Sequence, residues 1–508
     1  MANVSAEHSR SIWMDLTPLP SRPPLAGDLE ADVVVVGAGI AGLSTAYELA
    51  KAGRRVVVID RGEVAGGQSA RTTGHVSAEL DDFYYELIKL RGLDESRRYY
   101  GSVAEALDRI ETICRAEGIE NAYARVDAYL FQVPGDPPEV LDDELEACRQ
   151  IGFPGVELVR QAPVPGRDVG PAIRFPNQGR LHILNYLHGL VSAIEANGGQ
   201  VFANTACTAT SEEGERAIVE TDRGTIRAEH AVICTNSPIS ELPVHAKQAP
   251  YRTYAIAGRV PAGSVPDALV WDAMDAYHYV RIEPLGDGQD ALIVGGEDHK
   301  AGKEQDQDGR FARLEAWTRE HYPMLGAVEQ RWSGQVYEPV DFLPFTGLNH
   351  GRKRTWIHTG DSGEGLSNGV AGSLVLKDLI LTGSSKYADI YDPRRISAGS
   401  AVDALIEQKD VVANLAGYLT PGEVGSVDEI EPGHGALVRS GIKKHAAYRD
   451  EGGTLHVRSA TCTHAGCIVK WNGFERCWDC PCHGSQFAID GAVLQGPALT
   501  PLAKVDAE

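Results

Sequence analysis

The sequence predicts an α/β domain built on a parallel sheet, an antiparallel β domain and a small all-β domain at the C-terminus. A strand, a glycine-rich turn and a helix follow one another near the N-terminus, and residues 251–332 read as aromatic-rich strands. Residues 418–508 alternate short strands with glycine and proline turns. Because 508 residues exceed one ordinary core, we expect two or three domains.

The composition is that of a globular protein, with 43% hydrophobic and 23% charged residues. The net charge of -23 disfavours nucleic acids and anionic membranes as partners. No apolar run is long enough for a transmembrane helix. Residues 1–32 contain neither an apolar signal core nor a twin-arginine pair, so we expect a cytoplasmic protein.

The first chemical motif lies between two predicted strands. Residues 31–36 run into Gly37-Ala-Gly39-Ile-Ala-Gly42 and a helix, and the following strand ends at Asp60. A GxGxxG pattern alone is weak evidence and arises in fortuitous turns. In this context it is typical of dinucleotide binding, with the pyrophosphate at the helix N-terminus. Asp60 would then accept hydrogen bonds from ribose hydroxyls.

Hydrophobic periodicity places the remaining elements. We expect a long amphipathic helix, several short strands, and a glycine-rich turn that leads into a second helix. By residue number these are the helix 94–117, the strands 217–220, 225–227, 231–235 and 354–359, the turn 360–369, the helix 370–381 and a connector helix around 401–415.

Two Cys/His pairs stand close together in the tail, Cys462-x-His464 and Cys480-x-x-His483. Two thiolates and two imidazoles at this spacing suit a [2Fe–2S] cluster with cysteines on one iron and histidines on the other. A structural zinc site would also accept two cysteines and two histidines. Zinc does not explain why each loop carries a second cysteine in a matching place.

This tail strongly resembles the Rieske proteins of cytochrome bc-type complexes. The resemblance implies that the second cysteines, Cys467 and Cys482, form a disulfide that clasps the loops over the cluster. It also implies that the hydroxyl of Ser485 bonds a cluster sulfide. Phe487 stands where high-potential Rieske proteins have a tyrosine. One hydrogen bond to a cysteine sulfur is then missing, so we predict a potential below that of respiratory centres.

The glycine motif, the strand 231–235 and the turn 359–369 resemble FAD-dependent oxidoreductases of the D-amino-acid-oxidase class, such as glycine, sarcosine and glutamylputrescine oxidases. A branch of that class carries a C-terminal Rieske domain. The resemblance implies an α/β FAD-binding Rossmann-like domain with an antiparallel β substrate domain, plus a small all-β Rieske [2Fe-2S] domain. The residues that it implies for FAD are Gly37, Gly39, Gly42, Asp60, Arg61, Arg71, Thr72, Gly360, Asp361 and Gly365.

The same resemblance divides the chain into a discontinuous FAD-binding domain, a substrate domain, a linker and a Rieske domain. The expected boundaries are 1–90, 150–245 and 335–382 for the FAD-binding domain, 91–149 and 246–334 for the substrate domain, 383–417 for the helical linker, and 418–508 for the Rieske domain.

Three side chains are candidates for contact with a substrate. His75 follows the segment that approaches the flavin ring in such enzymes, and could act as a base or pack beneath the ring. Arg281, on an aromatic-rich strand, could clamp a substrate carboxylate or be a surface arginine. Tyr254 is either a site tyrosine or a core residue.

Together these features predict an FAD-dependent oxidoreductase that oxidises a small amine or amino acid at a C–N bond. Exposed cluster histidines would relay single electrons between the flavin and an external partner, such as a ferredoxin, a cytochrome or a reductase. The chain has no second GxGxxG after a strand and no oxygenase-type iron triad. One alternative is an electron-transfer protein that serves a partner oxygenase or reductase, without dehydrogenase activity of its own. Another is a peroxide-producing oxidase whose cluster is structural.

Overall fold

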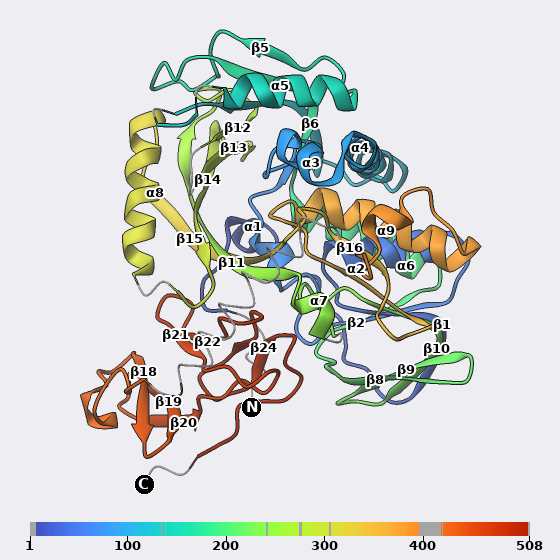
Figure 1. Ribbon diagram of the computed structural model, residues 1–508, viewed down its shortest axis with the longest axis vertical. Helices are drawn as coiled ribbons and strands as arrows, with labels where there is room; N and C mark the ends of the chain where they lie inside the picture. The colour runs from blue at the N-terminus through green and yellow to red at the C-terminus, as the bar shows by residue number, and fades with distance from the viewer. Residues whose placement is uncertain are drawn as a thin grey trace.

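The computed structural model describes residues 7–505, except for 134, 138, 240–241, 274–276, 304–305, 396–417 and 419. The connector helix expected around residues 401–415 lies outside the described residues, as does most of the expected linker. Figure 1 shows two large sheets side by side, with the small C-terminal domain below them and the N-terminus beside that domain.

The first large sheet has the parallel core that the glycine motif predicts. Its order is β16-β17-β10-β1-β2-β7, with the β8–β9 hairpin on β10, and only β16 and this hairpin run antiparallel. The strands expected at 225–227 and 231–235 are one continuous strand. The strands are β1 Leu29–Val36, β2 Val56–Ile59, β7 Gln200–Phe202, β8 Cys207–Glu213, β9 Arg216–Thr221, β10 Thr225–Ile233, β16 Phe345–Leu348 and β17 Thr355–Thr359.

Helices cover this sheet. Helix α2 (Ile40–Lys51) packs between α6 (Ile183–Ala196) and α9 (Gly365–Thr382), and α4 (Leu93–Ala116) lies against α9. The long helix expected at 94–117 is therefore confirmed as α4. Helix α9 begins five residues earlier than expected, because the glycine-rich segment already enters the helix at Gly365. The shorter helices are α1 Ile12–Leu16, α3 Tyr84–Arg91, α5 Val140–Ile151, α7 Leu242–His245 and α10 Ala388–Tyr391.

The second large sheet has the order β15-β11-β14-β13-β12-β4-β6-β3, with β5 on β6, and its neighbours are antiparallel except for β12 and β4. β5 and β6 belong here although their segment was assigned to the FAD-binding domain. Helix α8 (Gln307–His321) packs on β11 and β14, where the sequence suggested only strands. The strands are β3 His75–Val76, β4 Tyr123–Phe131, β5 Glu157–Val159, β6 Ala172–Leu181, β11 Gln248–Pro261, β12 Leu269–Asp272, β13 His278–Pro284, β14 Gln289–Lys300 and β15 Val328–Pro339.

The C-terminal domain consists of two small antiparallel sheets. The first contains β18 Gly435–Ser440, β19 Lys443–Arg449 and β20 Leu455–Ser459; the second contains β21 Lys470–Asn472, β22 Cys477–Asp479, β23 Gln486–Phe487 and β24 Val493–Gln495.

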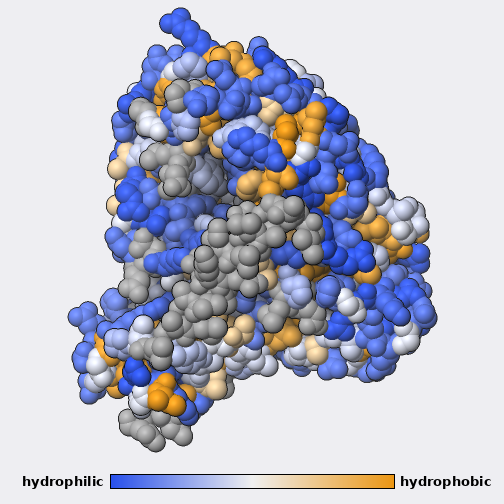
Figure 2. Space-filling model, viewed as in Figure 1, coloured by the Kyte–Doolittle hydropathy of each residue, from blue (hydrophilic) through white to orange (hydrophobic). Residues whose placement is uncertain are grey.

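Hydrophilic residues predominate on the coloured part of the face in Figure 2, with hydrophobic residues scattered over it. The large hydrophobic residues exposed in the described part of the chain are Leu16, Leu158 and Ile442. None of the helices in the described ranges has the length and apolarity that a bilayer crossing requires.

Candidate functional site

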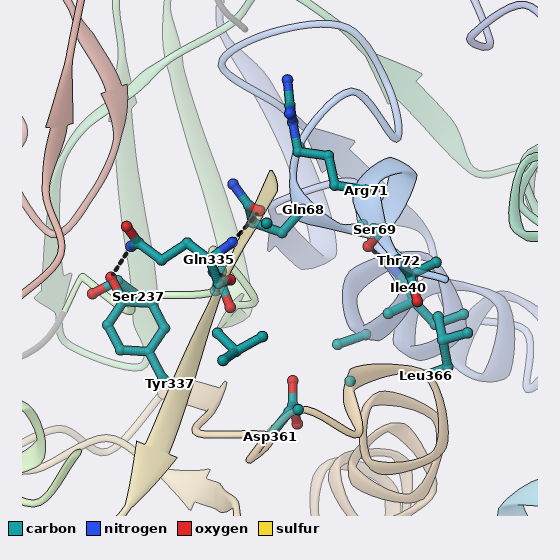
Figure 3. A pocket seen from close by; sticks show the side chains of 18 of the residues that line it. Ile40, Gln68, Ser69, Arg71, Thr72, Ser237, Gln335, Tyr337, Asp361 and Leu366 are labelled. Carbon is teal, nitrogen blue, oxygen red and sulfur yellow. Dashed lines mark hydrogen bonds between the residues drawn. The ribbon is translucent and has the colours of Figure 1, made fainter. Parts of the chain in front are cut away.

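A cavity of about 300 Å³ lies where the two large sheets and the C-terminal domain meet. One wall comes from the start of α2 and another from the start of α9, and β11–β15 supply a third. Figure 3 shows side chains from several of these elements around it. Leu494, Gln495, Gly496 and Leu499 of the C-terminal domain complete the lining.

The glycines of the first motif are required by close backbone approaches. Gly37 has φ +106°, and a Cβ built there would lie 2.2 Å from the carbonyl oxygen of Cys234. A Cβ on Gly42 would lie 1.9 Å from the carbonyl oxygen of Gly37. The turn therefore passes tightly between β1, α2 and the strand that ends at Ile233.

Polar groups suited to a dinucleotide surround this turn. Helix α2 starts at the cavity, and its N-cap Gly39 offers no capping side chain. The carboxylate of Asp60 accepts from the N–H of Ala38 at 2.7 Å and from that of Gly62 at 2.9 Å. Burial raises the pKa of Asp60. The hydroxyl of Ser69 accepts from the first helical N–H, that of Ile40, at 2.9 Å. The glycine cradle, the helix start and the buried acid together fit the ADP half of FAD.

Most of the residues implied for FAD line this cavity. Gly42 and Gly360 do not, and act through packing of the backbone. Arg71 contributes to the lining, but Figure 3 shows its side chain extending away from Asp361 and Leu366. The ones on the cavity wall are Gly37, Gly39, Asp60, Arg61, Arg71, Thr72, Asp361 and Gly365.

The cavity also holds a group of carboxyl side chains that sequence reasoning missed. Glu79, Asp81, Asp298 and Glu364, here called the acidic patch, all line it. Carboxylate oxygens of Glu79, Asp81 and Glu364 lie within 4.8 Å of one another. Burial raises the pKa values of Asp81 and Asp298 to about 7. The four residues are far apart in the sequence, so no local motif predicts that they come together.

Among the three candidate substrate contacts, only His75 lines the cavity. Its Nδ1 is 3.0 Å from the hydroxyl oxygen of Thr73, and its Nε2 is 3.3 Å from the carbonyl oxygen of Val280. Burial, assisted by the charge of Arg281, lowers the pKa of His75 to about 3. The imidazole is therefore neutral, and both of its nitrogens have partners.

The other two candidates lie outside the cavity lining. Arg281 is 1% exposed, and its guanidinium donates to the carbonyls of Gly74 and Leu181 and to Glu283. These internal acceptors occupy the guanidinium of Arg281, which is therefore unavailable to bind a substrate carboxylate. Tyr254 is buried, with its hydroxyl 2.9 Å from Nε2 of His299.

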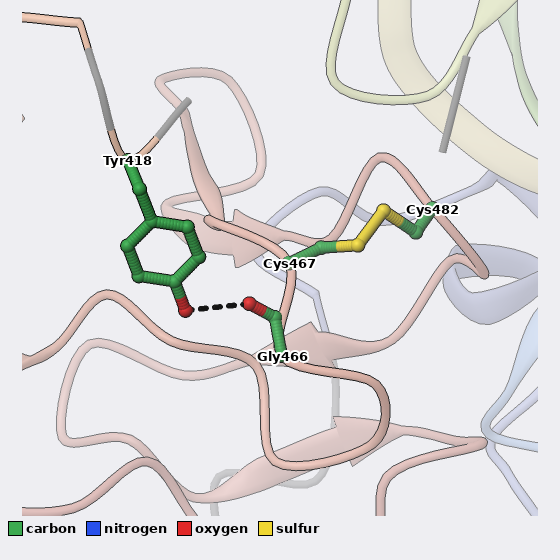
Figure 4. Close-up of a disulfide and its surroundings, with 4 residues drawn as sticks. All are labelled: Tyr418, Gly466, Cys467 and Cys482. Carbon is green, nitrogen blue, oxygen red and sulfur yellow. Dashed lines mark hydrogen bonds between the residues drawn. A yellow bond between two sulfur atoms is a disulfide. The ribbon is translucent and has the colours of Figure 1, made fainter. Parts of the chain in front are cut away.

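The two Cys/His loops of the tail have the same backbone design. The N–H of Cys462 donates to the carbonyl of Cys467, and the N–H of Cys480 donates to that of Ser485. Each loop turns through a glycine with positive φ. The expected disulfide joins Cys467 to Cys482 across the two loops, and the hydroxyl of Tyr418 donates to the neighbouring Gly466 carbonyl (Figure 4).

The four expected cluster ligands converge between these loops. The thiol of Cys480 hydrogen-bonds Cys462 and, against the effect of burial, brings the pKa of Cys462 to about 6. The rings of His464 and His483 are 5.0 Å apart. The Nδ1 atoms of both histidines are buried, with no hydrogen-bond partner in the described part of the chain. Two thiols and two unpartnered imidazole nitrogens fit a [2Fe–2S] cluster.

The two cluster histidines differ in exposure, and the expectation that both are exposed does not hold, because His483 is buried and His464 is half-buried. His483 is 8% exposed. The ring of His245, at the end of α7, lies 5.0 Å from that of His464 and 5.7 Å from that of His483. Spacing along the sequence predicts the four ligands but carries no information about what covers them.

Two side chains of β15 join the cavity wall directly to a cluster loop. Tyr337 donates its hydroxyl proton to the carbonyl of His483 at 3.1 Å. The amide of Gln335 donates to the carbonyl of Gly484 at 2.8 Å and to the hydroxyl of Tyr337 at 2.9 Å, as Figure 3 shows for the latter pair. Both side chains also line the cavity.

A buried ionic network anchors the C-terminal domain beside this contact. Arg71 pairs with Glu475 at 3.3 Å, and Arg252 pairs with Asp479 at 3.0 Å. Glu7 pairs with both arginines, at 3.0 Å and 2.6 Å. All five side chains are at most 5% exposed, so the network links the N-terminal segment, the body and the C-terminal domain out of contact with water.

Comparisons with known proteins agree with both halves of this site. Residues 32–379 match the family model described as FAD dependent oxidoreductase, and residues 420–506 match the Rieske [2Fe-2S] domain. The chain is 31% identical over 517 residues to a Bacillus subtilis protein named as a Rieske 2Fe-2S iron-sulfur protein, YhfW, with 100% of both chains covered. It is 41% identical over 92 residues to a cytochrome b6-f complex iron-sulfur subunit of Synechococcus, which covers 17% of this chain and 54% of that one.

Among solved structures, glycine oxidase from Geobacillus kaustophilus has a similar fold. The TM-score is 0.62 at 18% identity, covering 72% of this chain and 100% of that one.

Proposed function

This chain belongs to the FAD dependent oxidoreductase family and ends in a Rieske [2Fe-2S] domain, and we propose that it oxidises a small amine or amino acid and passes the electrons internally to its cluster. An external one-electron partner protein would then exchange electrons with that cluster. The observation that carries the proposal is the hydrogen bonding of Tyr337 and Gln335, which belong to the cavity wall, to the loop that holds His483.

The residues of the cavity have distinct parts in this function. The glycine turn and Asp60 would hold the nucleotide, and the start of α9 would face the other end of the cofactor. When bound, FAD accepts a hydride from carbon and releases electrons one at a time, which suits a one-electron cluster. Leu494, Gln495, Gly496 and Leu499 of the Rieske domain line the cavity on one side, where they would help to exclude water.

The fold supports an amine or amino acid as substrate, because glycine oxidase shares it. The partner would approach the cluster domain at the loop of His464, where Thr463 is exposed and residues 464–466 are half-buried. A cytoplasmic location remains an expectation from the sequence.

Anaerobic rapid mixing tests the proposal. We expect an amine or amino acid from a panel to bleach the flavin absorbance, followed by the electron paramagnetic resonance signal of a reduced Rieske cluster. The second step should be first order and independent of protein concentration, since both centres are in one chain. If only reduced ferredoxin or a reductase reduces the flavin, the chain is an electron-transfer protein instead.

A pair of variants tests the internal route. Tyr337→Phe removes the hydrogen bond to the His483 carbonyl, so reduction of the cluster should slow severalfold while reduction of the flavin keeps its rate. Tyr391→Phe is the matched control, because its buried hydroxyl bonds Ser102 far from the cluster loops. Equal electron-transfer rates in the two variants would contradict the route.

A further inference from the structure

The acidic patch contains buried carboxyl oxygens that no described group hydrogen-bonds. Glu79 is 2% exposed, and its Oε1 has no hydrogen-bond partner among the described residues. Asp298 and Glu364 each also have one buried carboxylate oxygen without a hydrogen-bond partner among the described residues. Unpaired buried carboxylates are costly unless a cation or a proton joins them.

The four carboxyl groups come from different elements that converge on one region of the cavity. Glu79 and Asp81 follow β3, Asp298 lies on β14, and Glu364 is the N-cap of α9. A Cβ on Gly363 would lie 2.5 Å from Oδ2 of Asp81. The close approach of these segments keeps the acids together.

Positive charge on the described cavity wall is directed elsewhere. Arg61 adjoins Asp60 at the nucleotide end. Arg71 is engaged by Glu7 and Glu475. Arg281 is outside the lining. Arg310 acts electrostatically on Asp298, but it does not line the cavity and pairs with Glu297. A substrate carboxylate would therefore face carboxyl groups at the described wall of the acidic patch.

Aromatic rings complete the same part of the cavity. Trp271, Tyr277 and Tyr279 line it, and the two tyrosine rings are 5.4 Å apart. The hydroxyl of Tyr277 donates to Asp81 at 3.1 Å, which fixes that ring beside the acids. Carboxylates beside aromatic faces are the surroundings that alkylammonium ions prefer.

We infer that the acidic patch and its aromatic neighbours bind an organic cation, an alkylamine or diamine without a carboxylate. This inference rests on the proposed function, and narrows "amine or amino acid" to the amine. Burial, with repulsion from Asp81 and Glu144, holds the pKa of Glu79 well above its usual value. A bound ammonium group would offset both the lost solvation of the Glu79 carboxylate and its repulsion from the neighbouring carboxylates.

Three probes of equal chain length test the inference by calorimetry and by perturbation of the flavin absorbance in air-oxidised holoenzyme. They are 1,5-diaminopentane, pentylamine and 5-aminopentanoate. We expect the two amines to bind, and 5-aminopentanoate to bind at least about tenfold more weakly, because its carboxylate meets the acids. Tighter binding of 5-aminopentanoate would overturn the inference, and would leave the proposed function intact.

Glu79→Gln should weaken binding of 1,5-diaminopentane at least about tenfold, since it removes a buried charge and keeps the shape. Glu48→Gln is the matched control: this acid is buried, pairs with Arg109 and does not line the cavity. Flavin content and melting temperature verify folding, and Asp298→Asn gives a second reading if Glu79→Gln does not fold.

Two further results separate the possibilities. Loss of Mn²⁺ binding in Glu79→Gln with unchanged binding of the amines would make the patch a metal site and overturn the inference. Amines that bind through Glu79 without bleaching the flavin under anaerobic conditions would uphold the inference while contradicting their proposed oxidation.

Discussion

Gly37 illustrates at the scale of one residue how the absence of a side chain positions a cofactor site. A methyl group there would lie 2.2 Å from a backbone oxygen, in a conformation with φ +106°. We expect Gly37→Ala to lower the free energy of unfolding by about 1–3 kcal/mol and to abolish retention of FAD. Flavin absorbance per chain and thermal melting measure the two effects.

Gly101→Ala is the control for that variant. Gly101 lies inside α4, and an added Cβ would meet only the hydroxyl end of Tyr387, at 3.3 Å. Normal flavin content is expected there. Full retention of FAD by Gly37→Ala would contradict the prediction, because it would show that the backbone of the turn can shift to accommodate a methyl group.

Ser485 and Phe487 are the residues that we expect to determine the hydrogen bonding around the cluster sulfurs. Both are fully buried, and the hydroxyl of Ser485 accepts from the N–H of Ala498 at 3.1 Å, which leaves its proton for sulfur. Hydrogen bonds to sulfur raise the potential of such clusters. We expect Phe487→Tyr to raise the midpoint potential and Ser485→Ala to lower it in a redox titration. A wild-type potential at or above that of respiratory centres, or shifts of the same sign, would contradict this account.

At the scale of elements, the two cluster loops are equivalent turns in unequal surroundings. Gly466 and Gly484 have φ values of +79° and +72°. A Cβ on Gly466 meets nothing within 4 Å, whereas one on Gly484 would lie 2.4 Å from the hydroxyl of Tyr337 and 2.5 Å from Nε2 of Gln335. The difference lies in contacts with β15 and with Pro250 of β11, whose Cβ would lie 2.8 Å away.

This pair isolates docking of the cluster loop from strain of the turn. Gly466→Ala and Gly484→Ala carry the same backbone strain, so both should lose some stability. Only Gly484→Ala should also slow transfer of electrons from flavin to cluster, because it pushes the loop away from the cavity wall. Rapid mixing followed by paramagnetic resonance measures that rate, and equal rates would show that β15 is not part of the route.

The elements differ in how far the sequence determines them. The β1–α2–β2 unit and the convergence of the two Cys/His pairs could be predicted, because periodicity, glycines and Cys/His spacing are local. Helix α8 could not, since aromatic residues such as Trp317 satisfy either a strand or a helix until tertiary packing decides. The acidic patch could not be predicted from the sequence either, because Glu79 and Glu364 come together only once the two large sheets are in place.

At the scale of the whole molecule, the arrangement of domains decides the direction in which the cluster faces. Sequence spacing led to exposed histidines that contact a partner. The structure turns His483 toward the body and places His245 against both ligand rings. A ligand motif does not predict how exposed its histidines are, because the residues that cover them belong to other segments of the chain. This arrangement fits the proposed transfer of electrons between the flavin cavity and the cluster.

The buried network around Glu7 holds that arrangement. Although burial opposes it, Arg71 and Arg252 bring the pKa of Glu7 from 4.5 to about 2. Since the folded pKa is depressed, its stabilisation is complete above about pH 4.5 and is lost as the pH falls toward 2. We expect Glu7→Gln to cost about 3–5 kcal/mol, because two buried arginines lose a partner.

A comparison of variants across pH distinguishes this network from a general effect of lost charge. Glutamine does not titrate, so the difference in melting temperature between wild type and Glu7→Gln should be constant from pH 8 to pH 5 and shrink below about pH 4.5. Glu48→Gln breaks a partly buried pair with Arg109 within the FAD-binding body. It should lower stability while leaving transfer from flavin to cluster unchanged, whereas Glu7→Gln should slow that transfer because the Rieske domain loosens. If Glu7→Gln melts lower but transfers electrons at the wild-type rate, the contacts of β15 alone dock the cluster.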